Sequence, residues 1–235
     1  MKNKQQVDII TRSYLNLQSP KAHRGNVIIF FLIFLDVMGL LPILGDPFSP
    51  LYFWLAIVPI VFIHLWGIFY VLAPYKYEKS YYLFFGIYGV INTYVFFLVI
   101  QKFLYLNVGV RGIAPFIIGV ISLIALLVFI QYFNLRMLYS GTYARLQKNK
   151  QPMNMSPYIN AAGFGYVLAQ FFMSSLFADS FISFVLMFII SLMSIVTAYF
   201  SIYIHRYIFL IKNYDTVKKL YPEFGLPKKH RKYIF

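Results

Sequence analysis

Residues 26–44 read NVIIFFLIFLDVMGLLPIL, and this stretch decides the kind of fold. A helix needs about 20 mostly apolar residues to cross the hydrocarbon core of a bilayer. The one ionisable residue in the stretch, Asp36, costs about 2.5–3.5 kcal/mol at the centre of a span, whereas the Leu, Ile, Phe and Val residues contribute roughly 4–8 kcal/mol in favour of insertion. We therefore expect residues 26–44 to form a membrane-spanning helix that is retained in the mature protein.

Five further stretches have the length and apolar character of a span: residues 51–73, 81–100, 112–135, 158–178 and 181–204. The whole chain of 235 residues is 60% hydrophobic and 12% charged, against about 45–50% and 25% in a soluble domain. The sequence therefore predicts an all-α, polytopic integral membrane protein whose six transmembrane helices form three hairpins. It contains no Cys, which excludes disulfides, thiolate metal sites and thiol nucleophiles.

The distribution of basic residues predicts the orientation. Of the 21 Lys and Arg residues, the connections 45–50, 101–111 and 179–180 hold only two, Lys102 and Arg111, and the remaining 19 lie in the tails and the other two connections. Cytoplasmic loops of membrane proteins collect Lys and Arg. We therefore expect both termini in the cytoplasm, and we attribute the net charge of +14 to topology and anionic lipid and not to nucleic acid.

The chain divides into a basic N-terminal tail (1–25), a transmembrane domain (26–211) and a basic C-terminal tail (212–235). In the N-terminal tail, apolar side chains recur at helical spacing, at Val7, Ile10, Tyr14 and Leu17. Two interpretations stay open for this face. It lies in the membrane interface, or it packs on the protein's own loops.

Asp36, His64, Asn92 and Gln170 are polar residues near the middle of predicted spans. Asp36 and His64 lie on consecutive helices, each about 14–15 Å from the cytoplasmic end at 1.5 Å per residue. We expect these two to bond across the helices, with the other two nearby in a polar layer. An intramembrane ionisable group suggests a functional site, but interhelical hydrogen bonding alone also explains such residues.

The C-terminal tail ends in a basic and aromatic run, with cations at Lys228, Lys229, Arg231 and Lys232. Such a run can bind anionic headgroups or an acidic partner, and it can equally be a solvated end that enforces topology. No sequence motif of a metal site, a phosphate-binding loop or a hydrolase is present. We therefore predict no enzyme activity, no cofactor and no metal.

In size, span count, composition and basic tails, the chain resembles small multi-span proteins encoded beside type VII secretion systems of Gram-positive bacteria. The resemblance covers the layout of the whole chain and rests on no motif, so it brings no residue roles. It implies a cell-membrane protein that binds a membrane or secreted protein, as a secretion accessory or as an immunity protein against a membrane-active toxin. The alternative is a small transporter or channel built on Asp36, His64 and the Gly-rich stretch 158–178.

Overall fold

The computed structural model describes residues 2–15, 17–148 and 179–231, and these ranges are helical and contain no strand. The elements are α1 (Lys2–Leu15), α2 (Pro20–Phe30), η1 (Phe31–Leu40), α3 (Leu41–Leu44), α4 (Pro50–Leu72), α5 (Glu78–Lys102), η2 (Phe103–Asn107), α6 (Ala114–Tyr139), α7 (Thr142–Lys148), α9 (Asp179–Phe200), α10 (Ile202–Lys212), α11 (Tyr214–Leu220) and η3 (Lys228–His230). The elements η1 and η2 are π-helical, and η3 is a 3₁₀ turn.

Five helices of the described chain are long and apolar enough to cross a membrane: Asp8–Leu44, Pro50–Leu72, Glu78–Asn107, Ala114–Tyr139 and Phe181–Lys212. They contain five of the six predicted spans almost entirely, and the remaining prediction, residues 158–178, lies outside the described residues. Three helices run beyond their predicted ends: Glu78–Asn107 passes residue 100 by seven residues, through η2, Ala114–Tyr139 passes residue 135 by four, and Phe181–Lys212 passes residue 204 by eight. The connection that follows η2 is correspondingly shorter.

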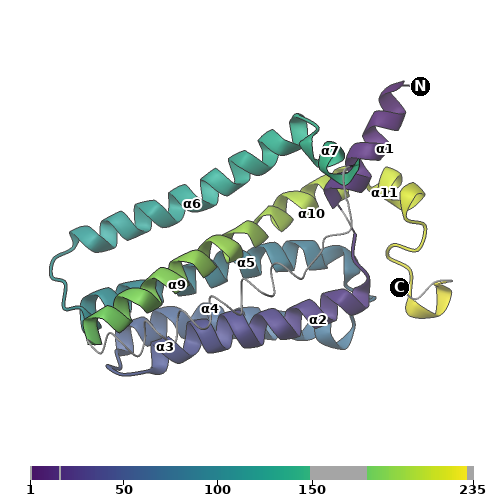
Figure 1. The fold of residues 1–235 in the computed structure, drawn as a ribbon. Coiled ribbons are helices and arrows are strands. Elements are labelled where there is room, and N and C mark those ends of the chain that lie inside the picture. Colours follow the sequence, from purple (N-terminus) through teal and green to yellow (C-terminus); the bar gives the residue numbers. More distant parts are fainter. Residues whose placement is uncertain (1, 16, 149–178, 232–235) are drawn as a thin grey trace, which may run out of the picture.

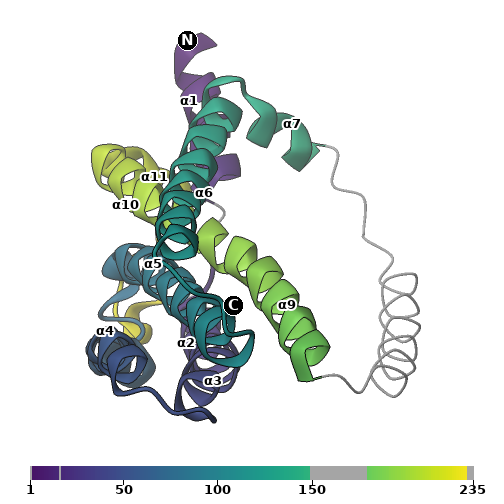
Figure 2. The same cartoon turned by 90° about the vertical axis from the view of Figure 1, so that its left-hand side faces the viewer.

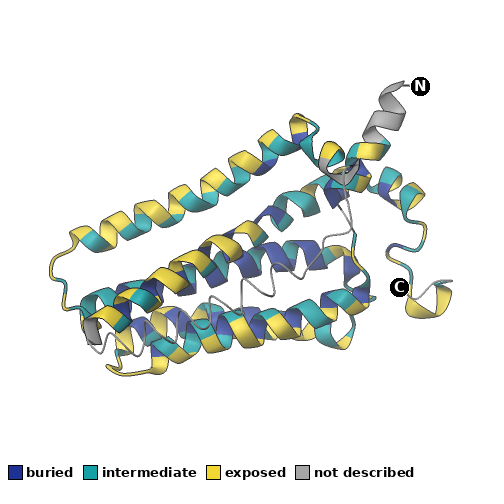
Figure 3. Ribbon diagram, in the orientation of Figure 1, coloured by how far each residue is buried: buried dark blue, intermediate teal, exposed yellow. Residues whose placement is uncertain are grey.

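The long helices run roughly antiparallel in an elongated bundle (Figure 1). The N-terminus and the last part of the chain lie at the same end of this bundle, which we call the termini end. Seen from the side (Figure 2), α5 lies between α4, the α2–η1–α3 helix and α9. Figure 1 shows α6 along one edge of the bundle. The core therefore surrounds α5, which contains more buried residues than any other described element (Figure 3).

Two glycines let α5 approach α9 and α10 closely. A Cβ added at Gly86 would lie 2.5 Å from the backbone nitrogen of Ile204, and one at Gly89 would lie 2.7 Å from both the Phe200 Cβ and the Thr197 oxygen. Small residues at such positions are what allows membrane helices to pack backbone to backbone. One turn further along, the buried hydroxyls of Thr93 and Thr197 lie 3.0 Å apart and join the same helices.

A buried lysine fastens the other end of the bundle. Lys102, the last residue of α5, donates from Nζ to the carbonyl oxygens of Pro42, Ile43 and Gly45 at 2.7, 2.9 and 2.5 Å. The last carbonyls of a helix have no partner within it, and a cation at this end also interacts favourably with the helix dipole. Lys102 therefore caps the first span, which explains why this basic residue lies at the end of the bundle opposite the basic tails.

The N-terminal helix α1 packs on the protein itself. It contacts α7, α10 and α11, and Tyr14 and Leu15 are fully buried, with Ile10 partly buried beside them. Of the two interpretations of the apolar face, the contacts favour packing on the protein's own elements. After Leu15, the hydroxyl of Ser19 accepts from the N–H of Ala22 and begins α2.

Candidate functional site

Asp36 and His64 meet between η1 and α4, as their shared depth predicted. The Asp36 Oδ1 atom lies 3.2 Å from the His64 Nε2 atom, and the two side chains are 35% and 36% exposed. Asp36 lies in the middle of the π-helix η1, where the Leu41 N–H bonds to the Asp36 carbonyl five residues earlier. π-Helical turns within α-helices are rare and occur frequently at functional sites.

The other ring nitrogen of His64 is also bonded. Its Nδ1 lies 2.9 Å from the carbonyl oxygen of Ile60, one turn earlier in α4. Pro59 precedes Ile60 and lacks the N–H that would bond to the carbonyl of Leu55. The Tyr94 hydroxyl of α5 donates to that Leu55 carbonyl at 3.4 Å. Side chains thus bond to the carbonyls of Leu55 and Ile60 on either side of Pro59.

An aromatic layer separates the Asp36–His64 pair from the centre of the bundle. The buried ring of Phe31 stands edge-on to the His64 ring at 4.8 Å and stacks on Tyr88 at 5.0 Å. Gly67, one turn after His64, makes this possible, because a Cβ there would lie 2.8 Å from the Phe31 ring. The pair therefore faces outward from the bundle, with packed rings behind it.

The rest of the predicted polar layer does not join this pair in the described part of the chain. Asn92 is fully buried in α5, and neither atom of its side-chain amide has a hydrogen-bond partner there. Gln170 lies outside the described residues. The structure thus assembles a site from two of the four predicted residues.

The C-terminal tail folds back onto the start of α5. Arg231 pairs with Glu78, whose carboxylate accepts from both Nη atoms at 3.3 and 2.5 Å and from the Gly225 N–H at 2.7 Å. Both charged side chains are less than one-tenth exposed. Among the tail cations predicted to contact lipid or a partner, Arg231 is therefore engaged within the protein, Lys228 and Lys229 are exposed, and Lys232 lies outside the described residues.

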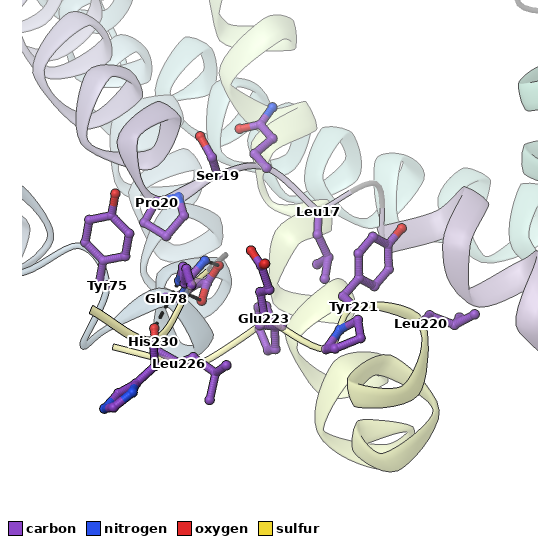
Figure 4. Close-up of a pocket in the computed structure, with 14 residues that line it drawn as sticks. Leu17, Ser19, Pro20, Tyr75, Glu78, Leu220, Tyr221, Glu223, Leu226 and His230 are labelled. Carbon is purple, nitrogen blue, oxygen red and sulfur yellow. Dashed lines mark hydrogen bonds and ion pairs between the residues drawn. The ribbon is translucent and has the colours of Figure 1, made fainter. Parts of the chain in front are cut away.

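A cavity of about 740 Å³ lies under this tail (Figure 4). The linker between α1 and α2 forms one side, with Leu17, Ser19 and Pro20, and the chain after α11 forms the other. Glu78 and Glu223 both line the cavity, and they are the only two glutamates of the sequence. The cavity is mostly apolar, with the Glu78–Arg231 pair in its wall.

A second polar cluster ties four elements together at the termini end. The Tyr14 hydroxyl lies 2.6 Å from the His205 Nδ1 atom and accepts from the Asn134 amide at 3.0 Å, while Tyr143 donates to the same amide at 2.8 Å. Burial raises the pKa of the Tyr143 phenol above its ordinary value, so the phenol remains a donor at neutral pH. The cluster joins α1, α6, α7 and α10.

Sequence reasoning missed the Glu78–Arg231 pair, the Tyr14 cluster and the capping role of Lys102. Arg231 is 153 residues from Glu78, and Asn134 is 120 residues from Tyr14, and no local pattern links such residues. Lys102 did carry a signal, since it is a cation at the end of the bundle that is otherwise poor in them. No group of three metal-binding side chains occurs within the described ranges.

No protein-family model, curated protein or solved structure matches this chain. Any functional conclusion therefore rests on the residues themselves.

Proposed function

We propose that the protein crosses the cell membrane six times and has both termini in the cytoplasm. The described chain reaches Lys148 at the termini end and resumes at Asp179 at the opposite end (Figure 1), which supports a further crossing by the predicted span 158–178. The split of 19 basic residues against two supports the orientation. The chain has no Cys, so a single introduced Cys reports one side of the membrane: Lys229→Cys the proposed cytoplasmic side and Asn107→Cys the outer side. An impermeant maleimide added to intact cells should label Asn107→Cys and not Lys229→Cys.

Within this topology, the proposed function is non-enzymatic binding of a membrane or secreted protein, as a secretion accessory or as an immunity protein against a membrane-active toxin. The observation that carries it is the Asp36–His64 pair, which is about one-third exposed on the outer face of two apolar helices. Polar side chains at mid-span normally face the bundle interior. A partner segment with a hydrogen-bonding side chain would cover the pair and gain specificity from it.

The direction in which the pair faces favours binding over transport. Its inner side is closed by the rings of Phe31 and Tyr88, so the pair opens toward the surroundings of the bundle. The exposed Lys228 and Lys229 add a contact with anionic headgroups of the cytoplasmic leaflet, worth about 1 kcal/mol for each charge near the surface. Neither contact requires nucleic acid or a cofactor.

Photo-crosslinking in native membranes tests the partner. A photoreactive residue at Leu32 or at Val61, each about one turn before a member of the pair and exposed, should capture the same stoichiometric protein. The same residue at Val128, exposed on α6, should not. Asp36→Asn should lower the crosslinked yield about tenfold, which corresponds to ~1.4 kcal/mol, and Asp46→Asn at the exposed end of the helix should not. Equal yields with and without Asp36 would refute the proposal.

One observation favours the second candidate, a small transporter or channel. Asp36 lies in the π-helix η1, and His64 follows the proline-bearing stretch of α4. Broken helices at mid-span form the binding sites of many transporters. The purified protein in liposomes distinguishes the two candidates. Solute or proton flux that depends on Asp36, without any partner present, would establish transport and displace the binding proposal.

A further inference from the structure

We infer that Asp36 and His64 together form a binding site for a single proton, and that their contact exists only while this proton is bound. The inference concerns the chemistry of the pair and holds with or without a protein partner. It rests on the hydrogen bonds of one imidazole ring and on the surroundings of the two side chains.

The hydrogen bonds of His64 determine its tautomer. The Nδ1 atom lies 2.9 Å from the Ile60 carbonyl oxygen, and a carbonyl oxygen can only accept, so Nδ1 must carry a hydrogen. In a neutral imidazole the second nitrogen is then a bare acceptor. Nε2 is the atom that faces Asp36.

The contact between His64 and Asp36 needs a hydrogen. The Nε2 atom and the Asp36 Oδ1 atom are 3.2 Å apart, and both are acceptors if His64 is neutral and Asp36 is ionised. A hydrogen between them turns this contact into a bond, either as imidazolium with carboxylate or as imidazole with carboxylic acid. Both forms hold one proton and have no net charge.

The environment of the pair favours the state with one proton and no net charge. Adding a second proton leaves the pair with a positive charge, and removing the proton leaves a negative charge and two opposed lone pairs. Either net charge is costly in the low-dielectric interior of a membrane. The pair should therefore hold one proton and separate when that proton leaves.

Neighbouring titratable groups do not change the number of protons that Asp36 and His64 share. In α5, the Tyr88 hydroxyl donates to the Phe30 carbonyl at 2.8 Å and the Tyr94 hydroxyl donates to the Leu55 carbonyl. The element α3 contains no titratable residue, and in α2 the His23 ring stacks on Tyr81. No charged side chain of the described elements packed on η1 and α4 bonds to the pair.

Histidine nitrogen NMR on the whole protein in bilayers tests the inference. His64→Gln identifies the His64 signals among the four histidines of the chain, and His230→Gln, at an exposed position, is the control that should leave them unchanged. Between about pH 5 and pH 8, Nδ1 should stay protonated. The Nε2 signal and the infrared carboxyl band of Asp36 should change together, in one step, or remain constant together.

Asp36→Asn provides the second measurement, because it keeps the shape and removes the acid. The Asp36 carboxyl band should disappear, and the Nε2 signal of His64 should change, because the group that faces it is then an amide that cannot share the proton. Separate changes of the Nε2 signal and the carboxyl band in the unmodified protein, a bare Nδ1, or an unchanged Nε2 signal in Asp36→Asn would each overturn the inference. These measurements contain no partner, so they can fail or succeed separately from the crosslinking.

Discussion

The helices α5 and α6 follow one another in the chain, have 25 and 26 residues and are both strongly apolar, but they are used in opposite ways. In the most apolar 18-residue window, 67% of the residues of Glu78–Asn107 are buried in the protein, against 0% for Ala114–Tyr139. Figure 3 shows the contrast along the two ribbons. One helix is the axis of the bundle, and the other presents its side chains to whatever surrounds it.

The difference lies in a few residues and not in apolar content. Lipid tails are as apolar as leucine, so burial of apolar side chains alone does not drive membrane helices together. In α5, Gly86 and Gly89 permit close backbone contact, and charged residues fasten both ends, Glu78 to the tail and Lys102 to the first span. The described contacts of α6 are fewer: Gly119 and Phe116 pack on Phe97 of α5, Gln131 bonds to Ser201, and Asn134 joins the Tyr14 cluster.

The largest expected effect is on the glycine contact. Gly89→Leu should destabilise the protein by about 3 kcal/mol, the upper part of the usual range for overpacking, because even a Cβ meets the Phe200 side chain and the Thr197 backbone oxygen at 2.7 Å. Thermal unfolding in detergent measures it. Ala125→Leu on the exposed side of α6 adds a side chain of the same size and should change stability by less than about 0.5 kcal/mol. Equal losses would mean that α6 is as tightly packed as α5.

Much of this contrast could not be read from the sequence. The spans could be predicted, because length and apolar character are local properties, and the meeting of Asp36 with His64 could be predicted from equal depth on consecutive helices. Apolar content, however, does not say which helix is central. The π-helix around Asp36 has no sequence signature, and the isolated burial of Asn92 depends on how α5 is rotated, which the depth argument ignores.

The Glu78–Arg231 pair could not be predicted from the sequence for a different reason. Its residues are 153 positions apart, and Arg231 belongs to a basic run in which Lys228 and Lys229 are exposed. Only the fold of residues 221–231 distinguishes Arg231 from Lys228 and Lys229. The candidate site was therefore predictable where two consecutive helices define it, and unpredictable where a tail returns to a distant helix.

An intermediate effect is expected from Lys102, which fastens the far end of α5. Lys102→Met keeps the length of the side chain but removes the ammonium from three carbonyls, and we expect a loss of about 2 kcal/mol, since a hydrogen bond to a charged group contributes about 1.5–3 kcal/mol. The same unfolding assay measures it. Arg111→Met, the exposed cation at the same end, should cost less than about 0.5 kcal/mol. A harmless Lys102→Met would show that the glycines alone hold α5 in place.

The smallest global effect is expected at the start of α5. Glu78→Gln leaves Arg231 without its counter-charge, and breaking a buried pair in this way usually costs about 3–5 kcal/mol. Here the tail can swing out and return Arg231 to water, so the loss is limited to the docking energy of residues 221–231, and we expect about 1 kcal/mol in global stability. The local effect should be larger, because the peptide bonds after Lys228 and Lys229 become accessible.

Limited trypsin digestion distinguishes local release of the tail from a global loss of stability. Cleavage in the tail should be several times faster in Glu78→Gln than in the unmodified protein, while cleavage elsewhere and the unfolding temperature change little. Asp215→Asn, an exposed acid in the neighbouring helix α11, should leave the tail protected. Unfolding of the whole bundle by Glu78→Gln would contradict this expectation. The Glu78–Arg231 pair would then stabilise the core around α5 as strongly as the contact at Gly89 does.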